Sequence, residues 1–383
     1  EAKLKGETVG DVAVGFMMKS GIDWNFGRDV VQSTELSRET PAYDLARACG
    51  SSLEASLQIA LKISAGMMDS GIAVGVETNS DLVASFSREM SQKLLSMNNA
   101  KTTGDKIKAA LRFGPGDFKP HFPGVVEKRT GLSMGEHCEK MVKEWGIDRK
   151  SQDELSLASH KAAARAYESG FYRDLVVPFA GQERDSFIRA DTTMEKLAKL
   201  PPAFDKSGAG SLTAGNSSPL SDGAATVLFG TKEYLDSKGL PARAEFVDAE
   251  IAGLDYVAGK GLLMAPTKAV ARLLERNKLT FNDIGLFEIH EAFAGQVLCT
   301  LKAWESEEYC RETLGLSKAM GPVPRDKMNL HGGSVALGHP FGATGARIVG
   351  TLAKALESKP AGTYGLISIC TAGGMGVAAL LRR

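Results

Sequence analysis

The sequence has 383 residues, 43% of them hydrophobic and 24% charged, a balance typical of a globular protein with enough chain for two or three packed units. Lysine plus arginine equals aspartate plus glutamate, 46 against 46, so the composition gives no support for a nucleic-acid partner, which needs a basic surface. The five cysteines lie far apart and form no CxxC pair, which argues against a disulfide framework or a structural zinc site. No run of about 18 apolar residues predicts a membrane-spanning helix.

The first 82 residues alternate short apolar runs with an amphipathic stretch, the pattern of an α/β protein. Val12–Phe16 predicts a buried strand, and Ile72–Val76 predicts a second one in a buried parallel sheet. Between them, the segment after Cys49 predicts a helix that ends near Gly66. Its apolar face carries Leu53, Leu57, Ala60 and Leu61.

Residues 83–205 are richer in charge and predict an insertion of helices and loops, with a helix near Ser151–Ser169. Within it, Met90–Phe113 places leucines among lysines, which fits a lid, a partner surface or a helix on a membrane surface. The favoured interpretation is a solvated helix that covers the core.

The C-terminal part repeats the order of a reactive residue, a helix and a buried strand. After Gly338–Pro340 we expect a helix, followed by a strand at Leu366–Ile369 that ends at Cys370 and a further apolar run at Val377–Leu381. The helix has Ile348, Val349, Leu352 and Leu356 on one face. Because the same order occurs once in each half, the sequence predicts a duplicated architecture.

Cys49 is the first candidate nucleophile. It comes just before a predicted helix, whose free N–H groups and positive dipole end would stabilise a thiolate. A lowered thiol pKa is what a cysteine nucleophile needs. A buried structural cysteine is the alternative, but the small residues Gly50–Ser52 leave room for a substrate.

Two histidine motifs follow later in the chain. In Gly332–Gly342, His339 is held between glycine and proline, a fixed position suited to proton transfer or to hydrogen bonding with an oxyanion. A phosphate-binding loop is the competing view, but neither GxGxxG nor GxxxxGK occurs there. In Glu288–Ala294, His290 precedes Glu291 without a second histidine at HExxH spacing, so we reject a metal site and expect a residue that holds a water or an oxyanion.

Cys370 lies in Ile369–Gly376, where a predicted strand enters a glycine-rich turn. A second reactive thiol at this position suits a general acid and base. Taken alone, Cys370 fits equally well as a packed strand cysteine, but chance does not readily explain four such motifs in one chain.

Together the motifs resemble the thiolase family. The segments DLARACGSS, EIHEAFA, GGSVALGHPFGATGAR and CTAGGMG occur in the order of the four thiolase active-site blocks, and Thr213–Ala225 resembles a fifth block that contacts coenzyme A. Histidine in HEAFA, where many thiolases have asparagine, resembles the branch of the β-subunits of fatty-acid oxidation trifunctional complexes, as does Gly131–His137.

The resemblance implies two βα halves in a five-layer αβαβα sandwich with an inserted loop domain. It implies an N-terminal half at 1–82, the insertion at 83–205, a return strand of the N-terminal half at 206–238 and a C-terminal half at 239–383. Thiolases usually have a further strand and helix before the point where this chain starts, and the first residue is Glu1. We therefore expect part of the first half to precede it.

The resemblance also implies a reaction, the coenzyme A-dependent cleavage of a 3-ketoacyl-CoA to acetyl-CoA and a shortened acyl-CoA. Cys49 matches the acylated nucleophile, His339 its activator, and Cys370 the thiol that protonates the acetyl-CoA carbanion. His290 matches the position at the enolate oxyanion hole, and the N–H groups of Cys49 and Ala372 match the second hole. Met134, Asn216 and Ser218 match positions that bind substrate or coenzyme A.

Coenzyme A is a substrate in this interpretation, so we expect no cofactor and no metal. The closest alternative is a biosynthetic-type acetoacetyl-CoA thiolase. A 3-ketoacyl synthase is disfavoured because it needs no second thiol, and a non-catalytic lipid carrier because all four reactive residues are present. Two departures affect substrate preference: Ala372 replaces a common glycine, and Ser217–Pro219 replaces a more usual Ala-Ser-Gly.

Thiolases are usually dimers or tetramers, so we expect at least a homodimer. A hydratase/dehydrogenase α-subunit is a further partner hypothesis, and contact with a membrane surface is a weaker one. We expect a cytoplasmic protein if its source is bacterial, and a mitochondrial-matrix or peroxisomal one if eukaryotic.

Overall fold

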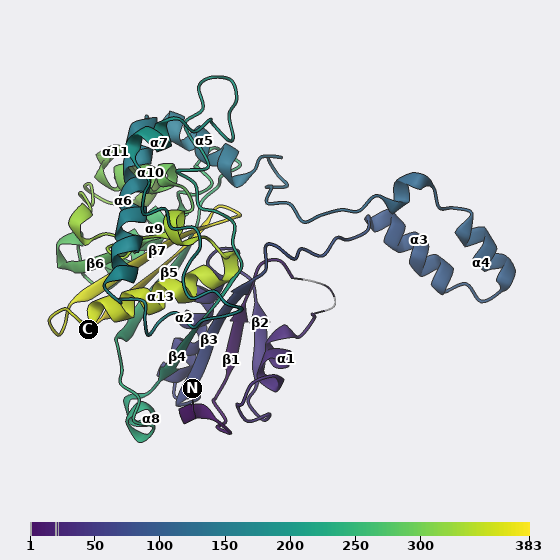
Figure 1. Cartoon of the computed structure of the whole chain (residues 1–383), viewed down its shortest axis with the longest axis horizontal. Coiled ribbons are helices and arrows are strands. Elements are labelled where there is room, and N and C mark those ends of the chain that lie inside the picture. The colour runs from purple at the N-terminus through teal and green to yellow at the C-terminus, as the bar shows by residue number, and fades with distance from the viewer. Residues whose placement is uncertain (1, 20, 22) are drawn as a thin grey trace.

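Two four-stranded sheets form the centre of the computed structural model, which describes residues 2–19, 21 and 23–383 (Figure 1). The first sheet has the order β2-β1-β3-β4 and the second the order β5-β8-β7-β6. The strands are β1 (Val12–Gly15), β2 (Ala42–Leu45), β3 (Ser70–Glu77), β4 (Gly223–Gly230), β5 (Glu245–Gly253), β6 (Ile284–Ile289), β7 (Tyr364–Thr371) and β8 (Met375–Arg382).

The two sheets are built in the same way. β3 pairs in parallel with β1 and antiparallel with β4, and β7 pairs in parallel with β6 and antiparallel with β8. A helix precedes each of these strands: α2 (Ser51–Ser64) comes before β3 and α13 (Thr344–Leu356) before β7. The predicted duplication is therefore confirmed, but the sheets are mixed, because β4 and β8 return antiparallel.

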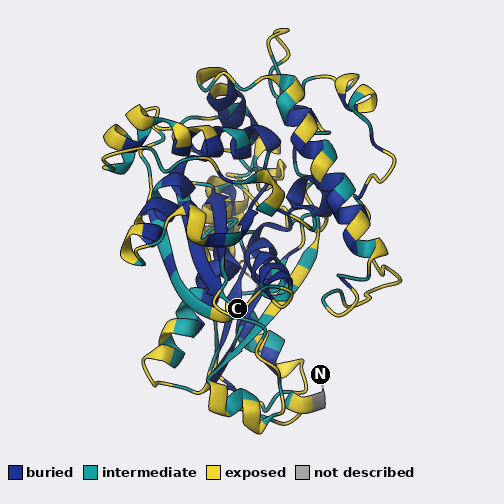
Figure 2. Cartoon of the chain, turned by 90° about the vertical axis from the view of Figure 1, so that its left-hand side faces the viewer, coloured by how far each residue is buried: buried dark blue, intermediate teal, exposed yellow. Residues whose placement is uncertain are grey.

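Helices and sheets alternate in five layers. α1 (Phe26–Gln32) packs on β1 and β2, α2 and α13 lie between the sheets, and α9 (Ala265–Arg276) covers β5 and β8. The strands at the centre are buried, whereas the exposed residues lie mainly on peripheral helices and loops (Figure 2). This is the predicted αβαβα sandwich.

The insertion between β3 and β4 has two parts. Its later helices pack on the body, since α5 contacts α10 and α6 contacts α10 and α12. Its first two helices, α3 and α4, project away from the body on extended segments (Figure 1). The helices of the insertion are α3 (Arg88–Asn98), α4 (Thr103–Ala110), α5 (Met134–Glu144), α6 (Arg149–Glu168) and α7 (Met194–Ala198). The helices of the body that they contact are α10 (Ala294–Glu305) and α12 (Ser334–Leu337).

The projecting helices correct one expectation. Met90–Phe113 was predicted to cover the core, but it forms part of two helices that stand clear of it. The chain turns between them because Thr102 caps α4, its hydroxyl accepting a hydrogen bond from the Asp105 N–H. Amphipathic spacing thus predicts the helices correctly but does not identify what their apolar face covers.

Several boundaries also differ slightly from those predicted. β7 extends to Thr371, so Cys370 lies within the strand rather than after it. α2 was predicted to end near Gly66 and ends at Ser64. Gly66 has a φ of +69°, the left-handed conformation in which a glycine often ends a helix. The remaining helical segments are α8 (Lys232–Ser237), α11 (Glu307–Tyr309), a π-helix (Cys310–Leu314) and the 3-10 turns Ala2–Leu4, Pro115–Phe118, Phe281–Asp283, Arg325–Lys327 and Phe341–Ala343. None of the helices in the described ranges is both long and apolar enough to cross a lipid bilayer.

The two central helices approach each other closely at their first turns. A Cβ placed on Gly345 would lie 2.3 Å from the backbone nitrogen of Leu53, and the Ala346 N–H donates to Ser52 Oγ at 2.8 Å. Only glycine permits this approach. The contact brings the segment that carries Cys49 next to the segment that carries His339.

We predict that Gly345→Ala lowers the free energy of unfolding by about 1–3 kcal/mol, because the new methyl group overpacks the helix crossing. Gly350→Ala, in the same helix but with no atom within 4 Å of its Cβ position, should instead stabilise the protein by about 0.4–1 kcal/mol. Thermal unfolding of both variants checks this. Equal effects of the two substitutions would contradict the close contact.

Candidate active site

One loop fixes both histidine segments. The Ser218 N–H donates to the Ala292 carbonyl at 3.0 Å, and the His339 N–H donates to the Pro219 carbonyl at 3.0 Å. The Ala294 N–H donates in turn to the carbonyl of Asn216. As a result the imidazole rings of His290 and His339 lie side by side, with 4.3 Å between their centroids.

Each imidazole is anchored through its Nδ1 atom. His290 Nδ1 lies 2.9 Å from Ser334 Oγ, and His339 Nδ1 lies 2.7 Å from Thr344 Oγ1. The two Nε2 atoms are buried and have no hydrogen-bond partner within the described part of the chain. Unpartnered buried nitrogens are rare in folded proteins and are expected where a ligand completes the hydrogen bonding.

Burial keeps both rings uncharged near neutral pH. It lowers the pKa of His339 to about 3, with a smaller contribution from the positive charge of Arg347. Burial also lowers the pKa of His290 well below its usual value, and His339 and Arg347 add to this. Each Nε2 atom therefore belongs to a neutral imidazole, which can accept or donate one proton according to its tautomer.

Cys49 lies in a strained turn just before α2. The preceding Ala48 has a φ of +44°, an unusual conformation for a residue with a side chain. The thiol accepts hydrogen bonds from the N–H groups of Ala372 and of Cys49 itself. Both residues predicted to form the second oxyanion hole thus direct their N–H groups to one place.

The Cys49 thiol is less acidic than the sequence predicts. Burial raises its pKa to about 12, and the two N–H groups lower it by less. The expected thiolate at the helix start is therefore wrong for the resting protein, because desolvation of the charged form outweighs the helix dipole. A base is needed to activate this thiol, and a neutral imidazole is one.

Cys370 provides the second thiol. It lies in β7, is 1% exposed, and has a pKa raised well above the usual value, first by burial and then by the neighbouring Cys49. It therefore rests as a protonated thiol, the form that a general acid requires. Ala372 follows in the turn between β7 and β8.

A glutamate that the sequence analysis missed holds this turn. Glu127, in the insertion just after the projecting helices, accepts a hydrogen bond from the Gly373 N–H at 2.6 Å and one from the Tyr256 hydroxyl at 2.9 Å. No local motif marks Glu127, because its partners lie more than 100 residues away in the sequence. It ties the base of the insertion to the turn that carries Ala372.

The three predicted coenzyme A contacts differ in their surroundings. Asn216 is fully buried, and both ends of its amide are bonded within the protein, to the Thr213 N–H and to Asp153 Oδ1. These bonds give Asn216 a role in shaping the loop, and its contact with substrate or coenzyme A stays a prediction. Ser218 and Met134 are half-buried, and Met134 packs against the apolar cluster that includes Cys370. Their contact with coenzyme A stays a prediction.

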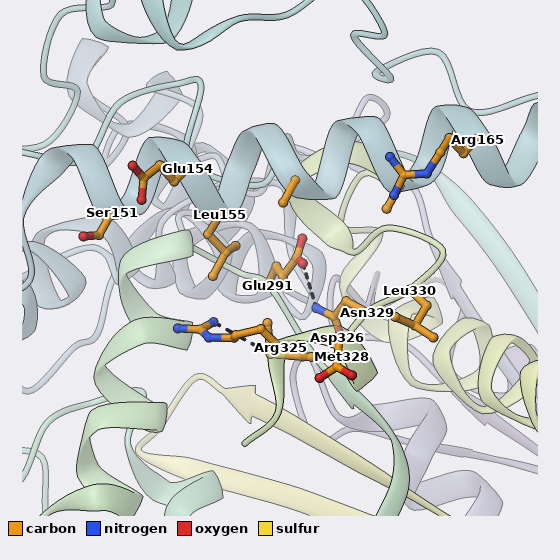
Figure 3. Close-up of a pocket in the computed structure, with 12 residues that line it drawn as sticks. Ser151, Glu154, Leu155, Arg165, Glu291, Arg325, Asp326, Met328, Asn329 and Leu330 are labelled. Atoms are coloured by element: carbon orange, nitrogen blue, oxygen red, sulfur yellow. Dashed lines mark hydrogen bonds between the residues drawn. The ribbon is translucent and has the colours of Figure 1, made fainter. Parts of the chain in front are cut away.

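The side chain of Glu291 has a structural role, because all its hydrogen bonds are to other residues of the protein. Its carboxylate accepts hydrogen bonds from Ser159 Oγ, Asn329 Nδ2 and the Val335 N–H. Figure 3 shows Glu291 and Asn329 at the wall of a pocket of about 490 Å³ between α6 and residues 325–330. The four candidate catalytic side chains do not line this pocket. Throughout the residues described here, we find no group of three His, Cys, Asp or Glu side chains arranged to hold a metal.

Comparison with known protein families identifies the family of this chain. The thiolase N-terminal domain matches residues 1–233, and the thiolase C-terminal domain matches residues 240–383. The chain belongs to the thiolase family. The family and the α/β fold expected from the sequence are thus confirmed.

Individual thiolases agree with this assignment over nearly the whole chain. A 3-ketoacyl-CoA thiolase of Pectobacterium carotovorum is 39% identical over 93% of the chain and 82% of its own length, and one of Yersinia pestis is 37% identical over 99% and 87%. Among solved structures, an acetyl-CoA acetyltransferase of Bacillus anthracis has a TM-score of 0.80 at 30% identity, covering 99% of the chain and 88% of its own. A thiolase of Ascaris suum in complex with coenzyme A has a TM-score of 0.78 at 26% identity, with the same coverage.

We predict that alkylation of resting Cys49 by iodoacetamide accelerates about tenfold per pH unit from pH 7 to 9. Because the Cys49 pKa is raised, the reactive thiolate is a small fraction that grows tenfold with each unit. Mass spectrometry of the Cys49 peptide gives the rate. A plateau near pH 7 would reveal a preformed thiolate–imidazolium pair and contradict this. The unfolded protein is the control, since its thiol has an ordinary pKa.

Proposed function

We propose that the chain is a 3-ketoacyl-CoA thiolase, cleaving its substrate with coenzyme A through an acyl-Cys49 intermediate. The observations that carry the proposal are two adjacent imidazoles with unpartnered Nε2 atoms and two neighbouring thiols, Cys49 and Cys370, each with a raised pKa. Coenzyme A acts as a substrate, and the chemistry needs no cofactor.

In the first half of the reaction, His339 Nε2 takes the Cys49 proton and the sulfur attacks the keto carbon. The tetrahedral alkoxide then collapses and breaks the bond between C2 and C3, which leaves an acyl-Cys49 thioester and the enolate of acetyl-CoA. The enolate is the high-energy species, so a hydrogen bond from His290 to its oxygen accelerates the step. Cys370 gives its proton to the enolate carbon, and acetyl-CoA departs.

In the second half, the Cys370 thiolate takes the proton of an incoming coenzyme A thiol. The coenzyme A sulfur attacks acyl-Cys49, the shortened acyl-CoA leaves, and Cys49 recovers its proton from His339. Two protons move out and two return, so the site ends each cycle as it began. Two thiols with raised pKa values suit this sequence, because each is protonated at rest.

Use of longer 3-ketoacyl-CoA substrates in β-oxidation is favoured over the acetoacetyl-CoA reaction. The support is the identity of 37–39% over nearly the full chain with proteins named 3-ketoacyl-CoA thiolase. The alternative draws on the likeness to an acetyl-CoA acetyltransferase at 30% identity.

We predict that the protein cleaves a long-chain 3-ketoacyl-CoA faster than acetoacetyl-CoA when coenzyme A is present. Cys49→Ala should abolish cleavage, and Cys370→Ala should slow it by about 100- to 10,000-fold, the contribution expected of a general acid and base. Loss of the ketoacyl absorbance measures both. Cys310→Ala, a buried cysteine that the mechanism does not use, is the control.

A faster reaction with acetoacetyl-CoA would support the biosynthetic alternative. Absence of turnover with either substrate, in protein that is folded and full-length, would contradict a thiolase activity.

We also propose that the chain works as a homo-oligomer and that α3 and α4 dock a hydratase/dehydrogenase subunit. Apolar side chains in this segment contact solvent instead of the core: Leu95 in α3, Ile107 in α4 and Leu111 just after α4 are 59%, 56% and 80% exposed. Exposed apolar side chains gathered on two neighbouring helices are typical of an interaction site.

We predict that thiolase activity from the native cells elutes in gel filtration together with hydratase and dehydrogenase activities. Leu111→Glu should separate them, because a buried charge in the interface is costly. Leu61→Glu, at an exposed leucine on the body, is the control and should leave the elution unchanged. Elution of the thiolase activity as a homo-oligomer alone would contradict the proposed hydratase/dehydrogenase partner. If that oligomer then co-sedimented with anionic vesicles, the two helices would be assigned to a membrane surface.

A further inference from the structure

A buried serine connects His290 to the positive charge of the half-buried Arg347. Arg347 Nη2 donates to Ser334 Oγ at 2.7 Å, and the same oxygen lies 2.9 Å from His290 Nδ1. Ser334 and His290 are each 1% exposed, so water does not compete for these positions. Ser334 comes from α12 and Arg347 from α13, so the chain of contacts joins three segments of the C-terminal half.

The order of donors in this chain fixes the tautomer of His290. A guanidinium group has five N–H donors and no acceptor, so the hydrogen between Arg347 and Ser334 belongs to the arginine. The serine hydroxyl has one hydrogen of its own, and among the described residues His290 Nδ1 is the other hydrogen-bond partner of its oxygen. With Nδ1 accepting, the hydrogen of the neutral ring lies on Nε2, the atom without a protein partner.

Arg347 is otherwise hard to explain. It is half-buried and forms no salt bridge with any residue that the structure describes, and its Nε atom has no partner there either. The neighbouring carboxyl of Glu288 is fully enclosed, and burial raises its pKa to about 8, so it is mostly protonated at pH 7. Enclosing a cation without an ion-pair partner costs stability. A functional role accounts for its presence.

We propose that Ser334 and Arg347 are positioning residues that hold His290 with its hydrogen on Nε2, so that this atom donates to the enolate oxygen of acetyl-CoA. The proposal rests on the thiolase function proposed above. In the other tautomer, Nε2 would present a lone pair to a negatively charged oxygen, and the interaction would be repulsive. His339, whose Nδ1 contacts a threonine hydroxyl and no cation, stays free to accept a proton at its own Nε2.

The two oxyanion sites give a way to test this. Cleavage of the ketoacyl substrate, and exchange of the acetyl-CoA methyl hydrogens with deuterium from solvent, both pass through the enolate. Transfer of an acetyl group between acetyl-CoA and isotopically labelled coenzyme A passes only through acyl-Cys49. A residue that serves His290 alone affects the first two reactions and spares the third.

We expect Ser334→Ala and Arg347→Met to slow cleavage and deuterium exchange by about 10- to 100-fold. This is less than the full loss of an oxyanion donor, because the Nε2–H tautomer stays accessible in the variants. Acetyl transfer to labelled coenzyme A should change by less than about threefold. Ser56→Ala removes another fully buried serine hydroxyl, which donates to the Ser52 carbonyl within α2, and should change none of the three rates.

An equal loss of all three reactions would show a merely structural role and overturn the proposal, as would unchanged rates or a loss confined to acetyl transfer. If Ser334→Ala does not fold, the same three rates can be measured with Arg347→Met. Failure of the wild-type protein to cleave any ketoacyl substrate would instead refute the thiolase function, and is therefore distinguishable.

Discussion

The site depends on the contact between the backbones of α2 and α13. α2 belongs to the N-terminal half and follows the nucleophile, whereas α13 belongs to the C-terminal half and follows His339. Because Gly345 lets the two helices touch at their first turns, both helix starts lie at the same level of the sandwich. The loop of residues 213–221 then adds hydrogen bonds to both histidine segments, so the halves meet through backbone atoms and not only through side chains.

Burial is the second constraint, and it determines the protonation of the resting site. The two imidazoles are adjacent, as are the two thiols, and desolvation pushes all four groups toward their neutral forms. A neutral site avoids the cost of buried ions while it waits for substrate. Charge then appears only during the reaction, on atoms that are already next to hydrogen-bond donors, which is where a low-dielectric site stabilises it most.

Much of this could be predicted from the sequence because the motifs are local. Apolar runs identified the strands around the site, and glycine-rich segments identified the turns at Cys49 and His339 and the turn that follows Cys370. The remaining features are long-range or quantitative. Glu127, Ser334 and Arg347 act through partners that only the fold brings near, Asn216 turned out to bond within its own loop, and the acidity of Cys49 depends on burial that no motif records.

The split of the reactive residues between the two halves has a consequence for synthesis of the protein. Cys49 leaves the ribosome 290 residues before His339 (339 − 49), about 15 to 60 seconds earlier at ordinary elongation rates. An unfolded thiol has ordinary acidity, whereas in the finished fold burial raises the pKa of Cys49 and the second half contributes the Ala372 N–H that contacts its sulfur. The completed fold therefore makes the nucleophile less acidic than it was in the nascent chain, and confines its reactivity to molecules that enter the finished site.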